Sequence, residues 1–382
     1  MPCWRLSAFY LFFFGSLGAL LPYWSLYLKS LGFSPTDIGE LMALIMATKI
    51  IAPNIWGWVA DHTGKRLVII KLTTLAAAIS FAGVFMGQGY WWMAALMCLF
   101  SFFWNAALPQ FEATTMSRLG DDVHRYSSIR LWGSVGFILA VVVLGEALEH
   151  TDITVIPVVI WLLLIGLFLV TLVVPGENGA SHEHSDSTIW QALRRKEVIV
   201  VLLVCFLLQA SHGPYYTFFT IYLELHDYSR GVIGQLWALG VVAEIGVFLV
   251  MHRLMPRFGP YMLLLWSLGL TTVRWLLIAW FPELGGVIVF AQCLHAASFG
   301  IYHAVAIHLI HSFFVGRHQG RGQALYSSLS FGAGGALGSL GSGYIWAEVS
   351  PEATYLAAAS ISALAMIVTL WAIKLKYFEK NL

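Results

Sequence analysis

Charged residues are scarce in this sequence. Asp, Glu, Lys and Arg make up only 11% of its 382 residues, whereas soluble domains carry about 25%. Hydrophobic residues make up 59%, and the mean hydropathy is +0.77. This composition predicts a polytopic membrane protein whose partner is a lipid bilayer. The net charge of +1 does not point to nucleic acid, and we expect no nucleic-acid partner.

Cysteine and enzyme motifs are scarce as well. The four cysteines are Cys3, Cys98, Cys205 and Cys293. Their scattered positions lack CxxC or ligand-like spacing, so neither a disulfide framework nor a metal site is indicated. The HEH tripeptide at 182–184 is interpreted as part of a solvated linker. No Walker loop, HExxH or GxSxG motif occurs. We therefore expect no cofactor, no metal and no enzymatic activity.

Long apolar stretches are abundant. A transmembrane helix needs about 20 mainly apolar residues, and the sequence divides into twelve such stretches. Their approximate limits are 6–28, 37–56, 67–87, 91–117, 127–148, 153–174, 198–223, 231–251, 260–281, 285–314, 322–346 and 352–373. The first is too long for a signal peptide and lacks a small-residue cleavage site. The sequence therefore predicts an all-α membrane protein with twelve transmembrane helices.

One long polar segment, 175–196, divides these stretches six and six. It predicts an N-terminal six-helix bundle at 1–174, a cytoplasmic central loop at 175–196 and a C-terminal six-helix bundle at 197–382. If both termini lie inside, the outer loops contain only Lys29 and Arg230 as basic residues. The positive-inside rule therefore predicts a multi-pass protein with both termini in the cytoplasm.

The two halves share a sequence pattern. YLKSLGFSPTDIGEL at 27–41 matches YLELHDYSRGVIGQL at 222–236, with a constant offset of 195 residues. Parallel repeats of six helices are a transporter architecture, in which the substrate site lies at the repeat interface near the bilayer midplane. The same offset relates Lys49 to Glu244, so a cation and an anion are expected at pseudo-equivalent positions.

Two opposite charges lie in neighbouring apolar stretches. Glu112 and Arg130 are each nine residues from Asp121 in the intervening turn, so antiparallel helices would place them at about the same depth. A charge in the bilayer core costs at least about 2.5–3.5 kcal/mol, and such residues are usually functional. An arginine fork is a natural ligand for a carboxylate or a pair of hydroxyls. The alternative is a structural ion pair between the two helices.

Other polar residues interrupt the apolar stretches. Lys49 is too deep to reach the aqueous interface easily, so it either pairs with an acid or binds a substrate carboxylate. Apolar neighbours of Glu244 disfavour the charged carboxylate, which suits this residue to proton uptake and release. Gly213 and Pro214 are expected to break the seventh span, and the adjacent His212 is a candidate substrate contact.

The segment GWVADHTGKR at 57–66 resembles the signature loop of the major facilitator superfamily, G-x-x-x-D-R-x-G-R/K-R/K, with a histidine at the usual arginine position. The matching residues are Gly57, Asp61, Gly64, Lys65 and Arg66. The resemblance implies the major facilitator fold of two pseudo-symmetric six-helix bundles. The glycines would allow a tight turn, and the aspartate would cap or pair with neighbouring helix ends. An ordinary charged cytoplasmic turn is the alternative.

NAALPQFEA followed by RLWGSVGF resembles the fourth and fifth spans of the lactose-permease group of proton symporters. The resemblance implies that Glu112 and Arg130 bind substrate and that Phe137 stacks on it. In addition, Glu244, Arg274 and His295 match the proton-coupling residues of that group.

The pattern departs from this group at Ser298, where the group has a proton-carrying carboxylate three residues after the histidine. Histidine itself titrates near physiological pH, so His295 is a second candidate for the proton site. A histidine in a membrane helix also commonly serves as a hydrogen-bond donor between helices.

Segments from nearly the whole chain resemble the phenylpropionate permease family of the same superfamily. They are LPYWSLYLKSLG, which contains Tyr23, the basic Lys49, RLWGSVGF, LLQASHGPYY, LWALGVVAEI, VRWLL and QCLH. The resemblance implies proton-coupled import of small aromatic acids through a bacterial inner membrane. Tyr23 is expected to line the substrate cavity.

We therefore expect a monomeric secondary transporter that works by alternating access, with a small aromatic carboxylate and a proton as its partners. The acid group would meet Lys49 or Arg130, and the ring would lie near Phe137. The alternative is a sugar or nucleoside symporter, in which Glu112 and Arg130 bind hydroxyls. A membrane scaffold or sensor without transport activity would instead tolerate neutral replacement of these charges.

Overall fold

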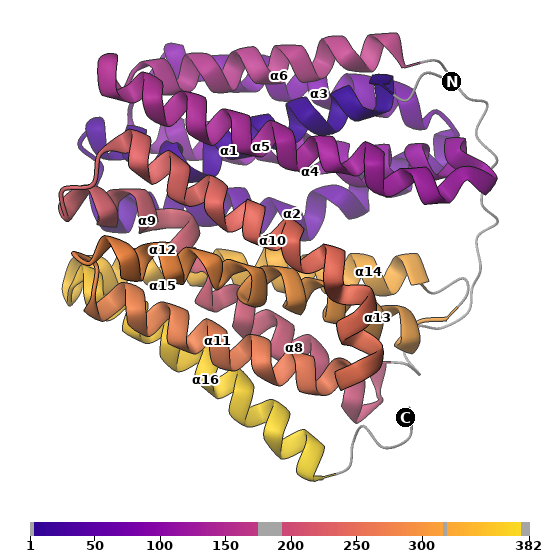
Figure 1. Cartoon of the computed structure of the whole chain (residues 1–382). Coiled ribbons are helices and arrows are strands. Elements are labelled where there is room, and N and C mark those ends of the chain that lie inside the picture. Colours follow the sequence, from indigo (N-terminus) through magenta and orange to yellow (C-terminus); the bar gives the residue numbers. More distant parts are fainter. Residues whose placement is uncertain (1–3, 175–192, 316–318, 376–382) are drawn as a thin grey trace. The chain divides into compact units, whose positions relative to one another are not determined.

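Helices make up all the regular secondary structure in the described part of the chain. The computed structural model describes residues 4–174, 193–315 and 319–375 (Figure 1). Eleven of its helices are long and apolar enough to cross a membrane. The remaining predicted stretch, 322–346, is covered by α14 (Gln319–Ser327), η5 (Ser328–Gly334) and α15 (Gly335–Glu348). The predicted all-α membrane fold is confirmed.

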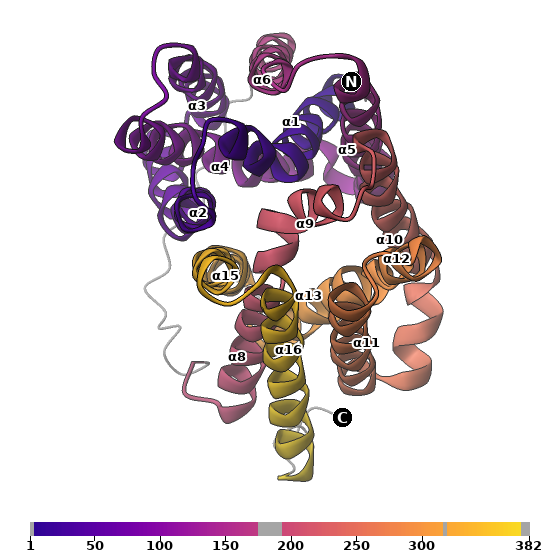
Figure 2. The same cartoon turned by 90° about the vertical axis from the view of Figure 1, so that its left-hand side faces the viewer.

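The first half of the chain consists of helices joined by short connections. They are α1 (Trp4–Ser30), α2 (Pro35–Thr63), α3 (Arg66–Phe81), η1 (Ala82–Phe85), α4 (Tyr90–Leu119), η2 (Gly120–Arg125), α5 (Tyr126–His150) and α6 (Val155–Val173). α1 packs against α5 and α6, and α4 packs against α2 and α3 (Figures 1 and 2). This packing places the Glu112 helix and the Arg130 helix in the same bundle.

The second half contains interrupted helices. Its elements before α14 are α8 (Lys196–Ser211), α9 (Gly213–Leu225), α10 (Arg230–Phe258), α11 (Pro260–Trp280), α12 (Gly285–Cys293), η3 (Ala296–Ile301) and α13 (Tyr302–Phe313), and α16 (Pro351–Lys374) follows α15. The seventh span is broken at His212, as the Gly213 and Pro214 pair predicts. η3 and η5 are π-helices, which often occur at functional sites.

The chain forms two compact units. The first comprises Met1–Glu183 and Thr217–Ala238, and the second comprises His184–Tyr216 and Leu239–Leu382. The C-terminal part of α9 and the N-terminal part of α10 therefore belong to the first unit. The predicted division at the central loop stays a prediction, because most of that loop, including the HEH tripeptide, lies outside the described residues, as does Cys3.

The backbone repeats with the same offset as the sequence. The ends of α1 and α9 are 195 residues apart, as are the starts and the ends of α2 and α10. Positive φ angles recur at this spacing, at Gly32 (86°) and Asp227 (61°), and at Gly64 (63°) and Gly259 (71°). Glycine and aspartate are among the residues that enter this left-handed region most readily. The two repeats therefore share their turn geometry as well as their sequence.

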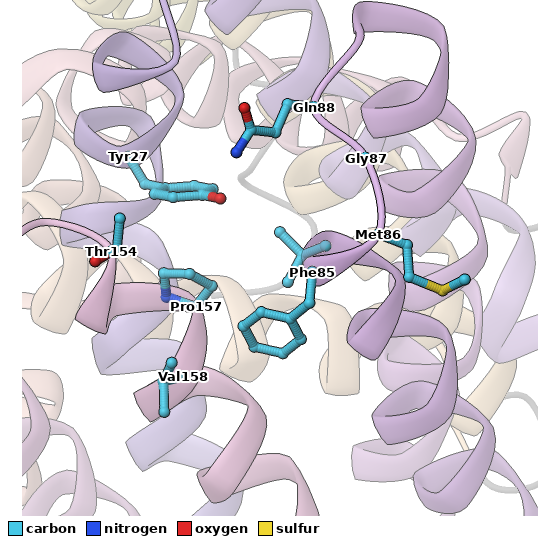
Figure 3. Close-up of a pocket in the computed structure, with 9 residues that line it drawn as sticks. Tyr27, Phe85, Met86, Gly87, Gln88, Thr154, Pro157 and Val158 are labelled. Atoms are coloured by element: carbon cyan, nitrogen blue, oxygen red, sulfur yellow. The ribbon is translucent and has the colours of Figure 1, made fainter.

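The first unit contains a cavity of about 590 Å³ (Figure 3). It lies where the end of α1 meets the start of α6 and the connection between α3 and α4. Tyr27, Phe85, Gln88, Thr154 and Pro157 are among its lining residues. None of the charges predicted to bind substrate lines it.

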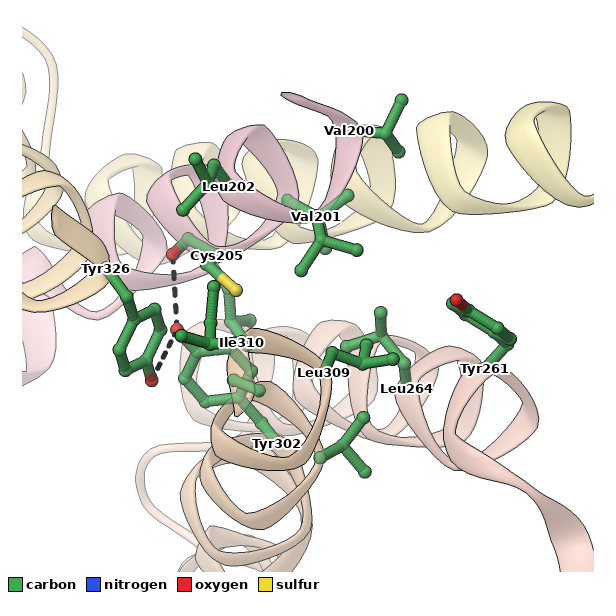
Figure 4. Close-up of a cluster of buried hydrophobic side chains, with 14 of the residues drawn as sticks. Val200, Val201, Leu202, Cys205, Tyr261, Leu264, Tyr302, Leu309, Ile310 and Tyr326 are labelled. Carbon is green, nitrogen blue, oxygen red and sulfur yellow. Dashed lines mark hydrogen bonds between the residues drawn. The ribbon is translucent and has the colours of Figure 1, made fainter. Parts of the chain in front are cut away.

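The second unit has a hydrophobic core with a chain of buried hydroxyls through it (Figure 4). The Tyr326 hydroxyl donates to the Tyr302 hydroxyl over 3.3 Å, and the Tyr302 hydroxyl donates to the Cys205 carbonyl over 3.4 Å. Each buried oxygen in this chain thus has a partner, which avoids the cost of an unsatisfied polar group in the core. These two hydrogen bonds tie α14, α13 and α8 together.

Candidate substrate and coupling sites

The two charges of the fourth and fifth spans meet in the structure. Nε of Arg130 on α5 lies 3.8 Å from Oε1 of Glu112 on α4, and each side chain is 32% exposed. The Tyr126 hydroxyl donates to the same oxygen over 3.4 Å. Contacts of this length hold the pair loosely. Nη1 and Nη2 of Arg130 have no hydrogen-bond or ion-pair partner among the described residues.

An aromatic ring that the sequence did not indicate fixes the plane of this guanidinium. Cζ of Arg130 lies 3.9 Å from the ring centroid of Phe14 and 5.6 Å from that of Tyr10, both on α1. A Cβ at Gly133 would lie 2.6 Å from Nη1 of Arg130 and 2.7 Å from Cδ2 of Phe14. Glycine therefore leaves the space in which the cation and the ring meet. No sequence spacing relates a first-span aromatic to a fifth-span arginine.

Lys49 lies half-buried on α2 of the same unit. Within the part of the chain that the structure describes, its ammonium group has neither an ion pair nor a hydrogen bond. The preceding Thr48 accepts a hydrogen bond from Asn105 over 2.9 Å and lies 2.8 Å from the Ser101 hydroxyl. Phe137 on α5 is 8% exposed. The predicted roles of Lys49 and Phe137 in substrate binding stay predictions.

Tyr23 joins three helices of the first unit. Its side chain is fully buried, and its hydroxyl donates to the Val141 carbonyl over 2.6 Å. A Cβ at Gly145 or Gly234 would lie only 2.6 or 2.7 Å from this hydroxyl. The tyrosine therefore packs where α1, α5 and α10 come close together. Its predicted contact with substrate stays a prediction.

Ion pairs and a hydrogen bond tie the ends of α1, α5, α9 and α10. Glu224 accepts from Lys29 over 3.4 Å and from Arg230 over 3.0 Å. The Gly231 amide donates to Glu149 over 2.6 Å. Lys29 and Glu224 are separated by 195 residues, so they occupy equivalent positions of the two repeats.

The second unit holds the three predicted coupling residues together. Arg274 on α11 is fully buried, and its Nη1 lies 3.1 Å from Nδ1 of His295. Nε2 of His295 lies 3.7 Å from Oε2 of Glu244 on α10. Their roles in proton coupling stay predictions, although the structure brings all three into one cluster.

Neutral groups complete the surroundings of Arg274. Nη1 donates to Ser298 over 2.9 Å, and Nη2 donates to Oε1 of Gln292 over 3.1 Å. The rings of Tyr215 and Trp275 lie 4.3 and 4.6 Å from Cζ of the guanidinium. Sequence reasoning missed Gln292, although it is three residues before His295 and such a spacing puts two side chains on one helix face.

His212 lies at the break between α8 and α9. The side chain is fully buried, and Nδ1 lies 2.8 Å from the Leu208 carbonyl. A carbonyl only accepts hydrogen bonds, so Nδ1 carries the hydrogen. Among the described residues Nε2 has no hydrogen-bond partner. The predicted contact of His212 with substrate stays a prediction.

The signature loop forms a tight connection between α2 and α3. Gly64 adopts φ 63° as the C-cap of α2, and its amide donates to the Ala60 carbonyl. Asp61 forms an ion pair of 2.8 Å with Arg66, and Lys65 precedes the first turn of α3. A Cβ at Gly57 would lie 3.3 Å from the Gln110 amide of α4. The loop thus has the turn and the pairing expected of it, and its role in conformational change stays a prediction.

Metal-binding geometry is not found in the described ranges, where no group of three or more His, Cys, Asp or Glu side chains could hold an ion. Two clusters of charged side chains are the candidate sites. The first unit offers accessible guanidinium nitrogens, and the second unit offers a carboxyl group beside a histidine.

Comparison with known proteins gives concordant matches. Residues 3–357 match the model of the MFS_1 like family. A probable 3-phenylpropionic acid transporter from Escherichia coli (strain K12) is 30% identical, over 90% of each chain. The maltose permease of Geobacillus stearothermophilus is 27% identical, over 91% of this chain and 89% of the permease.

A solved structure shows the same fold. A variant of the nucleoside transporter NupG superposes with a TM-score of 0.86 at 16% identity, and covers 96% of this chain and 98% of that chain. The matched proteins are transporters, so this chain is a transporter and not an enzyme. The chain belongs to the MFS_1 like family, and it is a multi-pass secondary transporter of the major facilitator superfamily.

Proposed function

We propose that this chain is a proton symporter that imports a small aromatic carboxylate such as phenylpropionate by alternating access. It works as a monomer in the bacterial inner membrane, with both termini in the cytoplasm. The observation that carries the proposal is the unpaired edge of Arg130, whose Nη1 and Nη2 have no partner among the described residues. The name of the 30% identical Escherichia coli relative supports the same substrate class.

The geometry of Arg130 suits a carboxylate. A guanidinium and a carboxylate form two parallel N–H···O bonds when both nitrogens of the fork are available. Phe14 covers one face of the guanidinium, and Glu112 contacts it only at Nε. The fork is therefore held in one plane with its terminal nitrogens accessible. Lys49 contributes a second cation that has no counter-ion among the described residues, which favours an anionic substrate over a neutral one.

Membrane electrostatics gives the reason for proton coupling. Moving one negative charge into a negative-inside cell is opposed by about 2.3 kcal/mol per 100 mV. Symport of one proton with a monoanion cancels this cost, because no net charge crosses the membrane. The Glu244, His295 and Arg274 cluster supplies the group that would take up this proton.

Uptake into proteoliposomes under an imposed proton gradient tests the proposal. We expect accumulation of phenylpropionate and cinnamate, and none of a disaccharide or a nucleoside. Arg130→Gln should abolish accumulation of the acids. Arg125→Gln is the matched control, because Arg125 is half-exposed and lies 3.8 Å from Asp122. Uptake of a sugar without uptake of any aromatic acid would overturn the proposal.

A sugar or nucleoside symporter is the second candidate. It is favoured by Glu112, which is as exposed as Arg130 and would accept hydrogen bonds from hydroxyls, and by the 27% identical maltose permease. Under this alternative Glu112→Gln removes uptake of the neutral solute. Under the preferred function the same variant retains uptake of the acid, because the arginine fork remains.

A further inference from the structure

Arg274 determines which nitrogen of His295 carries the ring hydrogen. A guanidinium has five N–H donors and no acceptor. Nη1 of Arg274 lies 3.1 Å from Nδ1 of His295, so Nδ1 accepts this bond and the hydrogen sits on Nε2. The two side chains are 0% and 7% exposed. The guanidinium is also held by Gln292 and Ser298, so it has little freedom to leave the imidazole.

A second proton on His295 would conflict with this arrangement. It would occupy Nδ1, where a donor of Arg274 already points, and two donors cannot share that position. It would also place an imidazolium beside a buried guanidinium, and like charges repel strongly in an interior of low dielectric constant. Arg274 forms no ion pair with any carboxylate in the described ranges, so its charge is not neutralised locally. The arrangement therefore keeps His295 neutral.

The remaining hydrogen of His295 faces the acid of the cluster. Nε2 lies 3.7 Å from Oε2 of Glu244, which is longer than a hydrogen bond and within reach of a small rotation of the carboxylate. Small residues permit this approach. A Cβ at Gly240 would lie 3.3 Å from Cδ2 of His295, and a Cβ at Gly300 would lie 2.5 Å from Cγ1 of Val247. α10 can therefore pack close to the π-helix η3.

We infer that the coupling proton is carried by Glu244, and that His295 is a positioning residue that stays neutral and presents its Nε2 hydrogen to this carboxylate. The inference rests on the proposed proton symport. Uptake of the proton forms one O–H bond on Glu244 and leaves every bond to His295 and Arg274 unchanged. Release breaks that O–H bond and returns the carboxylate.

Other titratable groups surround the pair. Tyr215 and Tyr216 of α9 interact electrostatically with Glu244, and Arg274 and His212 interact with His295. Neutral tyrosine hydroxyls are hydrogen-bond donors, so Tyr215 and Tyr216 are not expected to take up a proton. Ser298 offers Arg274 a neutral acceptor where a second acid would have competed for its charge. Glu244 is the one carboxyl group among these residues, so we assign the proton to it.

His295→Gln separates the positioning role of this side chain from a role in carrying the proton. Oε1 of the introduced side chain can accept from Arg274 and its Nε2 can donate to Glu244, so it reproduces both contacts of the neutral histidine but does not titrate. We expect His295→Gln to accumulate phenylpropionate uphill under a proton gradient. Glu244→Gln should lose uphill accumulation and keep exchange of labelled for unlabelled substrate. His308→Gln is the control for the substitution itself, because His308 lies exposed on α13.

The outcomes distinguish the inference from the proposed function. If the wild type accumulates no aromatic acid, the proposed function fails before any variant is measured. If the wild type is active and His295→Gln loses accumulation, with or without exchange, while it still folds, the histidine is more than a positioning residue and the inference is overturned. Normal uphill uptake by Glu244→Gln would overturn it as well.

Infrared difference spectroscopy gives a second test that does not require a histidine variant. Spectra of the wild type recorded across a pH change should contain the C=O band of a protonated carboxyl group, and Glu244→Gln should lack it. The band should persist in His295→Gln and in His308→Gln. Persistence of the full band in Glu244→Gln, or its absence from the wild type, would place the proton elsewhere.

Discussion

Gly133→Ala tests how Arg130 is held. The new Cβ would lie 2.6 Å from Nη1 of Arg130 and 2.7 Å from Cδ2 of Phe14. Ordinary contacts begin near 3.4 Å, so the guanidinium must move by about 0.8 Å and the Phe14 ring by about 0.7 Å, which disturbs the contact between them. The guanidinium is the far end of a flexible side chain, so it can move without unfolding the helix. We therefore expect the binding geometry to change and the fold to persist.

The magnitude follows from the contact that is lost. A cation over an aromatic face contributes about 0.5–2 kcal/mol, and about 1.4 kcal/mol corresponds to a tenfold change in affinity. The Kd for phenylpropionate should therefore rise by roughly two- to thirtyfold. Replacing a helical glycine with alanine also stabilises the helix by about 0.5–1 kcal/mol. The variant should thus bind more weakly without a loss of thermal stability.

Isothermal titration calorimetry on the purified protein measures this Kd, and thermal unfolding measures stability in parallel. Gly246→Ala is the control, because a Cβ at this helical position meets nothing within 4 Å. It should gain the same helix stabilisation and keep the wild-type affinity. If Gly133→Ala bound phenylpropionate as tightly as Gly246→Ala does, the role assigned to Phe14 and Arg130 would be wrong.

Three further predictions concern single positions. Lys49→Met removes a cation that has no counter-ion in the described part of the chain, so thermal unfolding should show a gain of up to about 3 kcal/mol while acid binding weakens. A loss of stability would mean that the lysine is structurally paired. Gly64→Ala forces a side chain into φ 63° and should cost about 1–2 kcal/mol; an unchanged Tm would contradict this. The amide of Thr154 lowers the pKa of Asp152. The charged Asp152 carboxylate therefore stabilises the fold above the ordinary pKa of an aspartate, and this stabilisation is lost as pH falls through the lowered pKa. Asp152→Ala should flatten the acid limb of a Tm against pH curve, and an unaltered limb would refute the contribution.

Hydropathy and charge depth were sufficient to predict the helices and the contact between Glu112 and Arg130. Apolar length gave the membrane-spanning stretches, because the bilayer core imposes a minimum on each. Equal spacing from the intervening turn predicted that Glu112 and Arg130 would meet, since helical rise converts residue number into depth. The break beside His212 followed from the missing amide of Pro214, which weakens the helix locally.

The contacts that define each site needed the structure. Phe14 lies beside Arg130 because α1 packs on α5, and no local pattern encodes that packing. The π-helices η3 and η5 shift the register of the tenth and eleventh spans, so heptad-like spacing does not predict which side chains share a face there. The tautomer of His295 depends on a hydrogen bond from a different helix. Each of these depends on tertiary contacts and not on residue type.

The ion pair between Lys29 and Glu224 has a consequence for the origin of the chain. Lys29 and Glu224 stand at equivalent positions of the two repeats, and they contact each other. In a symmetric dimer of a single repeat, both positions would hold the same residue, and two lysines or two glutamates would repel each other. Opposite charges at the two equivalent positions require two copies that mutate independently. This salt bridge could therefore arise only after the two repeats had become separately encoded.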